Sequence, residues 1–113
     1  MIRVTIDQAE DGRIRGFTLA GHAEYAEPGR DIVCAGVSAV TFGTVNALEA
    51  LLHVDLDCET DEESGLFKAA VPPCPDPETE ERLQLLLRSM VVMLESIEES
   101  YGEYMHIIRT QGG

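Results

Sequence analysis

A histidine and a cysteine, His22 and Cys34, stand near the two ends of a stretch rich in small and turn-forming residues, GHAEYAEPGRDIVC. A cysteine thiolate is a strong nucleophile, and an imidazole within reach can take the thiol proton and return it to a leaving amine. The pair therefore indicates nucleophilic catalysis, provided that the fold brings the two side chains together. The alternative is that Cys34 is a small core residue, a common role for cysteine, and that His22 is unrelated to it.

The chain before this stretch is expected to form a β-hairpin. In residues 1–8 apolar and polar side chains alternate, which is the period of a half-buried strand. The Asp11-Gly12 pair indicates a hairpin turn, and residues 13–20 form the returning strand. This strand ends just before His22, so it delivers the histidine to one end of the sheet.

A long helix is expected to follow, from about Ile32 to Leu52, with Asp31 as its N-cap. Cys34 would then be the third residue after the cap, beside the free amides of the first helical turn. The positive end of the helix dipole stabilises a thiolate, and the free amides, that of Cys34 included, can donate to an oxyanion. The expected start of the helix therefore supports a catalytic Cys34.

Two stripes of residues run along this helix. One is apolar, recurs at spacings of three and four, and predicts a face toward the core. The other consists of small residues, and close packing against another element is expected there, because each interior glycine costs roughly 1 kcal/mol relative to alanine. The apolar stripe comprises Val33, Val37, Val40, Thr44, Leu48 and Leu51, and the small stripe comprises Gly36, Ala39, Gly43 and Ala47.

The second half of the chain repeats the order of two strands and a helix. The expected elements are strands at 53–60 and 65–72, a helix from Pro77 to about Ser100 capped by Asp76, and a last strand at 103–110. In the first of these strands Val54, Leu56 and Cys58 are expected to face inward. The order ββαββαβ predicts an α/β fold of the α+β type, with two helices on one face of a five-stranded mixed or antiparallel sheet.

Composition restricts the classes of protein to which the chain can belong. The 113 residues, 44% of them apolar, suit one domain over residues 1–113. Eight basic against 21 acidic residues give a formal net charge of −13, which disfavours nucleic-acid binding and suits either solubility alone or a basic partner. No signal peptide is evident and no apolar run approaches the roughly 18 to 20 residues that span a bilayer, so we expect a cytoplasmic protein without membrane contact.

The cysteines indicate reduced thiols. Cys34, Cys58 and Cys74 are odd in number and widely spaced, unlike a disulfide framework. No CxxC or HxxxH pair occurs, so neither a metal site nor a cofactor is expected. His53 and His106 lack a cysteine or acid at a telling spacing, and we expect both to be structural.

The run GHAEYAEPGRDIVCAGVSA, residues 21–39, resembles the ribosomal-processing cysteine protease family, Prp, and the resemblance in length and element order extends over essentially the whole chain. It implies a catalytic dyad of Cys34 and His22, and it matches the family's aspartate and serine to Asp31 and Ser38. It also implies a homodimer that removes the N-terminal extension of large-subunit ribosomal protein twenty-seven, next to aromatic residues. Gly36 and Val40 depart from the alanine and leucine frequent in the family, which bears on packing more than on chemistry.

The supporting residues have plainer interpretations beside these. Asp31 either caps the helix only or also orients His22, and Ser38 either bonds to a local carbonyl or supports the site. Gly21 makes a turn or lets the loop over residues 21–31 act as a mobile lid. The basic precursor would be attracted by the acidic surface.

Two other functions remain open. One is a noncatalytic acidic module for ribosome assembly or peptide binding, in which Cys34 is structural. The other is a thiol redox enzyme, although a resolving cysteine at CxxC spacing is absent from the sequence.

Overall fold

The computed structural model describes residues 1–21, 28–74 and 76–111, together with all side chains in these ranges except those of residues 28–31. The elements in chain order are β1 (Ile2–Gln8), β2 (Ile14–Ala20), α1 (Pro28–Leu52), β3 (Asp57–Asp61), β4 (Leu66–Ala70), α2 (Pro77–Tyr101) and β5 (Met105–Gln111). The predicted order ββαββαβ is confirmed.

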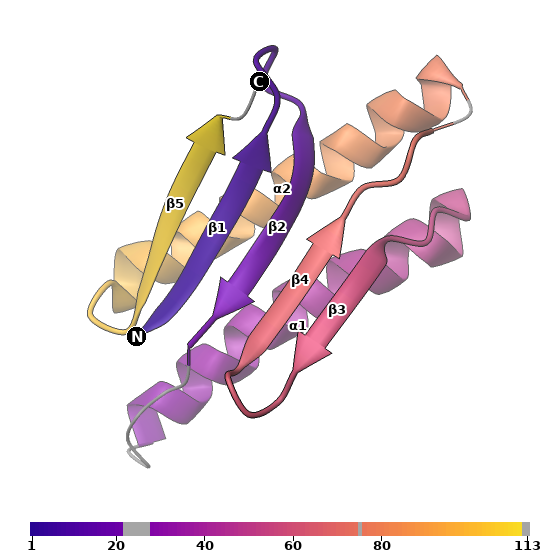
Figure 1. Cartoon of the computed structure of the whole chain (residues 1–113). Coiled ribbons are helices and arrows are strands. Elements are labelled where there is room, and N and C mark those ends of the chain that lie inside the picture. The colour runs from indigo at the N-terminus through magenta and orange to yellow at the C-terminus, as the bar shows by residue number, and fades with distance from the viewer. Residues whose placement is uncertain (22–27, 75, 112–113) are drawn as a thin grey trace.

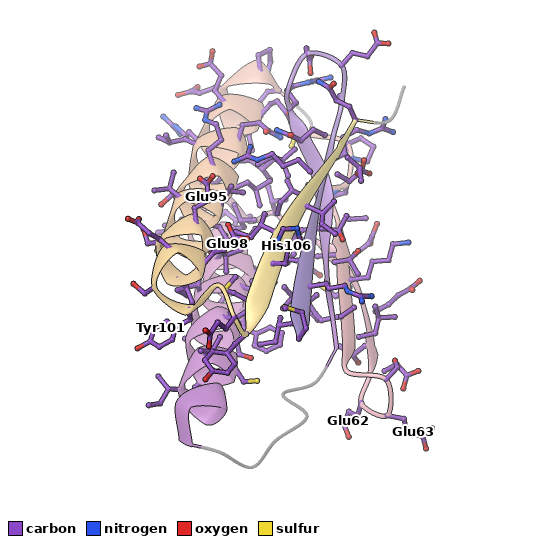
Figure 2. All side chains as sticks on the ribbon, turned by 90° about the vertical axis from the view of Figure 1, so that its left-hand side faces the viewer. Glu62, Glu63, Glu95, Glu98, Tyr101 and His106 are labelled. Carbon is purple, nitrogen blue, oxygen red and sulfur yellow. The ribbon has the colours of Figure 1, made fainter. Side chains whose placement is uncertain are left out.

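The strands form one mixed sheet in the order β3-β4-β2-β1-β5. All neighbours are antiparallel except β1 and β5, which run parallel because α2 carries the chain back along the helical face. Both helices cover the same face of the sheet (Figure 1), and Figure 2 shows this layering edge-on. The predicted fold class is confirmed.

The core lies between this face of the sheet and the two helices. Alternate residues of β1 and β2 point into it, as the period of two requires, and α2 contributes residues at helical spacing. The buried apolar residues from these three elements are Ile2, Val4, Ile6, Ile14, Phe17, Leu19, Leu83, Leu87, Met90, Val91 and Leu94. Within this core the amide of Gln84 bonds both backbone groups of Ile14, accepting from its N–H and donating to its carbonyl, each at 2.8 Å. A buried polar side chain is thereby satisfied and α2 is held against β2.

The start of α2 matches the sequence prediction. Asp76 has extended backbone angles, and its carboxylate accepts from the Thr79 N–H at 2.8 Å, with Pro77 at the first helical position. This hydrogen bond, together with a second one from the Thr79 hydroxyl, lowers the pKa of Asp76. Asp76 is therefore a working N-cap.

The start of α1 differs from the prediction. The helix begins at Pro28, not at Ile32, so Asp31 lies within its first turn and is not the N-cap. Proline is favoured at the first helical position because its fixed φ suits a helix and its missing N–H would have had no partner there. Residues 28–31 therefore belong to the helix, and the predicted loop over residues 21–31 is shorter at this end.

The two stripes of α1 behave differently. Val33, Val37, Thr44 and Leu48 are buried as expected, Val40 is partly buried, and Leu51 is 67% exposed, contrary to the expectation. The expected close packing of the small stripe is wrong: a Cβ built on Gly43 meets no atom within 4 Å, and one on Gly36 meets only Ile97, at an ordinary 3.6 Å. Three of the four small residues, Ala39, Gly43 and Ala47, line a shallow groove of about 350 Å³ between the helices instead.

The strand expected at 53–60 is also displaced. Val54 and Leu56 are buried as predicted, but they precede β3, which begins at Asp57. Every residue of β3 is exposed, Cys58 included, so its predicted inward position is wrong. This strand lies at the edge of the sheet, with β4 as its one neighbour in the sheet order.

One helical segment, Ile32–Leu52, has the length and composition to cross a membrane, so the expectation that no run approaches that length is wrong. In this structure Val33, Val37 and Leu48 of the segment are buried in the core of the domain. A core helix passes the same test of length and hydropathy, so the test alone is weak support for a membrane span.

Candidate active site

Cys34 lies on α1, six residues after the helix begins at Pro28, and is half-buried. At this depth its N–H falls beyond the first four, which are the only amides that a helix leaves unbonded at its N-terminus. The expectation that the sulfur lies beside free first-turn amides, and that the Cys34 amide donates to an oxyanion, is therefore wrong. The helix start at Pro28 could have been found from the preference of proline for the first helical position.

A pocket of about 300 Å³ opens beside Cys34. Its walls come from four parts of the fold: the ends of β1 and β2, the first half of α1, the turn between β3 and β4, and the start of β4. Figure 1 shows these parts meeting at one end of the molecule. The lining residues are Ile2, Leu19, Gly21, Cys34, Val37, Ser38, Phe42, Thr60, Asp61, Glu62, Gly65, Leu66 and Phe67.

Aromatic and aliphatic side chains make most of this lining. Phe42 of α1 meets Phe67 of β4 edge to face, with ring centroids 4.8 Å apart, and Phe67 in turn contacts the buried Phe17 at 6.0 Å. Such pairs hold the rings in fixed positions. Phe42 is nevertheless 42% exposed, so it presents apolar surface to whatever enters the pocket.

Polar groups of the pocket come from two parts of the fold. Ser38 lies one turn after Cys34 on the same helix and shares the pocket with it. Asp61 is the last residue of β3 and Glu62 begins the β3–β4 turn, where an Asp61 carboxylate oxygen accepts from the Glu63 N–H at 3.1 Å. The cysteine therefore faces a cavity with an apolar floor and an acidic rim.

Gly21 fixes the end of β2 at this pocket. Its φ is +99°, a conformation that other residues rarely adopt, and a Cβ there would collide with the Met1 carbonyl oxygen. The close approach of the chain to Met1 thus requires glycine. His22 follows directly but lies outside the described residues, as does the side chain of Asp31, so their predicted roles stay predictions.

The other cysteines and histidines lie apart from this pocket. Although Cys58 is exposed, the partial desolvation of its sulfur and the nearby carboxylates of Asp55 and Asp57 raise its pKa. Burial together with a hydrogen bond to Glu80 raises the pKa of Cys74 to about 11. Both are thus kept as thiols, which are poor nucleophiles. In the described part of the chain, no three His, Cys, Asp or Glu side chains are grouped so as to hold a metal ion.

The two remaining histidines occupy structural positions. His53 adopts a positive φ of 57° directly after α1, and its N–H bonds to the Glu49 carbonyl at 3.0 Å. His106 lies 3.5 Å from the Glu98 carboxylate, which also accepts from the Ile107 N–H at 2.7 Å and so occupies a backbone donor of the edge strand β5 (Figure 2).

Comparison with known proteins decides the family. The family model described as cysteine protease Prp matches residues 1–106. The chain belongs to the Prp cysteine protease family. The ribosomal processing cysteine protease Prp of Bacillus subtilis is 41% identical over 107 residues, which are 95% of this chain and 96% of the relative.

Two solved structures share the fold closely. The essential ribosomal processing protease Prp from S. aureus in complex with a substrate peptide has a TM-score of 0.84 at 35% identity. The same protease with a covalently linked product peptide has a TM-score of 0.83 at 37% identity. Each comparison covers 97% of this chain and 100% of the other. This Prp family member is therefore a cysteine protease.

Proposed function

We propose that this Prp protease removes the N-terminal extension of large-subunit ribosomal protein twenty-seven, with Cys34 as nucleophile and His22 as general base and acid. The observation that carries the proposal is the position of Cys34 on the wall of a mostly apolar pocket. Cys58 and Cys74 are held as thiols outside this pocket. Relatives named ribosomal processing proteases, one of them bound to a substrate peptide, support the substrate class.

The reaction follows from the two side chains. His22 takes the proton of the Cys34 thiol, and the sulfur attacks the carbonyl carbon of the scissile peptide bond. As the carbon–nitrogen bond breaks, the imidazolium gives its proton to the leaving amine, and the other fragment stays on the sulfur as a thioester. Water, deprotonated by His22, then attacks the thioester and releases a carboxylic acid and the thiol. The covalent product peptide on the S. aureus relative is consistent with such a mechanism.

Three residues support the dyad in this proposal. Gly21 sets the direction in which the chain leaves β2 toward His22. Ser38, one turn from Cys34, is a hydroxyl donor in the same pocket and supports the reacting groups. Asp31, in the first turn of α1, orients His22.

The assembly and setting are part of the proposal. The enzyme forms a homodimer, and the groove between α1 and α2, lined in part by the exposed side chain of Met93, offers an apolar surface for it. It works in the cytoplasm on a basic precursor, which its net charge of −13 attracts, and it binds neither nucleic acid nor membrane.

Mass spectrometry of the precursor after incubation with the enzyme tests the function directly. We expect one defined loss of mass with the wild type, and at least a thousandfold lower rate with Cys34→Ala and with His22→Ala. An intact precursor that still binds the wild type would favour the noncatalytic binding module. Turnover of peroxide without peptide cleavage would favour the redox enzyme.

A further inference from the structure

The pocket beside Cys34 has both an apolar surface and an acidic surface. Its floor is built from apolar side chains, among them Leu19, Phe42 and Phe67. Its rim at the β3–β4 turn carries the carboxylates of Asp61 and Glu62. A ligand that fills the pocket therefore meets hydrocarbon and negative charge within one cavity of about 300 Å³, near the lower end of the size range of ligand sites.

The charge of this rim is not neutralised from within the described part of the chain. No lysine, arginine or histidine is among the described side chains that line the pocket. The ion pairs of the described residues use Arg13, Arg82, Arg109 and His106, all with acids other than Asp61 and Glu62. The nearest lysine in sequence, Lys68, pairs in register with Thr18 and Glu59 in the sheet and does not line the pocket. Among the described side chains, the two carboxylates thus have no cationic partner, which leaves them for a cation of the substrate.

Figure 2 shows the direction of this charge. Glu62 and its neighbour Glu63 project from the β3–β4 turn at the end of the molecule, on the sheet side. An extended peptide advances about 3.3 Å per residue, so residues next to the one in the apolar pocket pass within reach of this turn. A lysine or arginine at such a position can bring its ammonium or guanidinium group to the carboxylates while its aliphatic stem stays on the apolar surface.

We propose that Asp61 and Glu62 are specificity-determining residues, which select a peptide carrying a lysine or arginine within a few residues of the apolar side chain that fills the pocket. This inference rests on the proposed peptidase function and names the substrate feature that the rim recognises. The selection is local: it depends on these two carboxylates and not on the net charge of the surface.

The experiment compares two peptides that span the cleavage site and differ at the basic positions, which hold lysine in one and glutamine in the other. We expect the wild type to have a kcat/KM about fivefold higher for the lysine peptide at low salt, as partly exposed charge pairs give. The double variant Asp61→Asn with Glu62→Gln should reduce this preference to less than about twofold. Asparagine at 61 keeps the acceptor for the Glu63 N–H, so the turn is preserved.

The matched control removes the same number of charges from nearby positions on β3. Asp57 and Glu59 lie on β3 but do not line the pocket, so Asp57→Asn with Glu59→Gln should keep the fivefold preference. Equal loss of preference in both double variants would overturn the inference in favour of general attraction by net charge. Equal cleavage of the two peptides by the wild type would also overturn it, while the peptidase function would stand.

Binding to the Cys34→Ala variant separates the inference from the function. If neither peptide is cleaved by the wild type, the Kd of each peptide for Cys34→Ala still tests the rim. Tighter binding of the lysine peptide, lost with Asp61→Asn and Glu62→Gln, would support it without a peptidase. The same Kd for both peptides would refute it.

Discussion

The two ends of the sheet differ in how their charges and backbone groups are satisfied. At the hairpin end, which comprises the β1–β2 turn and the start of α2, Arg13 pairs with Asp11 at 3.0 Å and with Glu80 at 3.6 Å. Gln84 satisfies both backbone groups of Ile14 there. At the pocket end, which comprises Gly21, the site of Cys34 and the β3–β4 turn, two carboxylates face a cavity without an ion pair among the described residues.

This difference separates the part of the molecule that stabilises the fold from the part that binds. Groups at the hairpin end already have protein partners, so changing them should cost stability and leave catalysis intact. Groups at the pocket end keep polar and apolar surface for a ligand, so changing them should alter activity. Gly21 is the exception, because it belongs to the pocket end and is constrained by the backbone.

Gly21→Ala should have the largest effect and should affect both properties. The substitution forces a side chain into a positive φ and against the Met1 carbonyl, so we expect a loss of about 3 to 4 kcal/mol in the free energy of unfolding. Activity should fall as well, because the chain leaves β2 toward His22 from this residue. Urea unfolding and peptide cleavage on the same samples measure the two effects.

Gly12→Ala is the matched control for this prediction. Gly12 has a similar φ of +90°, but a Cβ there meets no atom within 4 Å. We therefore expect only the backbone strain, about 1 kcal/mol, with normal activity. A similar loss of stability in both variants would show that the contact with Met1 is unimportant.

Gln84→Leu should have the next largest effect, on stability alone. Leucine preserves the buried volume but leaves the Ile14 N–H and carbonyl without the partner they have now, at a cost of about 2 to 3 kcal/mol. The kcat/KM of the folded variant should stay within about twofold of the wild type. The control Gln8→Leu removes an exposed side-chain bond to the Gly12 carbonyl and should cost less than about 0.5 kcal/mol. A large fall in kcat/KM for Gln84→Leu would contradict the separation of the two ends.

The sequence was most informative where local chemistry decides the structure. The alternation in β1, the apolar spacing of α2 and the Asp76-Pro77 cap each depend on neighbours within a few residues, and the structure confirms all three. The start of α1 was misplaced because Asp31 was chosen as the N-cap, although the preference of proline for the first helical position also indicated a start at Pro28.

The pocket could be predicted only in part. Cys34 was predicted as the nucleophile from the surrounding motif, because both lie in one short run of sequence; the structure places Cys34 on the pocket wall, and its catalytic role stays a prediction. The acidic rim was missed, because Asp61 and Glu62 come to share a pocket with α1 only through the pairing of β4 with β2, which links segments far apart in the sequence. Likewise, the exposure of Cys58 depends on the place of β3 at the edge of the sheet, and the open groove along Gly43 depends on how α1 and α2 pack together, neither of which a local pattern encodes.

Asp76→Ala should have the smallest effect, and this effect should depend on pH. The Thr79 hydrogen bonds lower the pKa of Asp76 in the folded state, so the cap stabilises the protein fully above its unfolded pKa of roughly 4. This contribution is lost as the pH falls through the lower folded pKa. The difference in Tm between wild type and Asp76→Ala should therefore be largest near neutral pH and shrink in acid. The control Asp76→Asn keeps an acceptor that does not titrate, so its Tm should exceed that of Asp76→Ala by the same amount at every pH. If the Tm difference between the wild type and Asp76→Ala were also independent of pH, the charge of the carboxylate would add nothing to the cap.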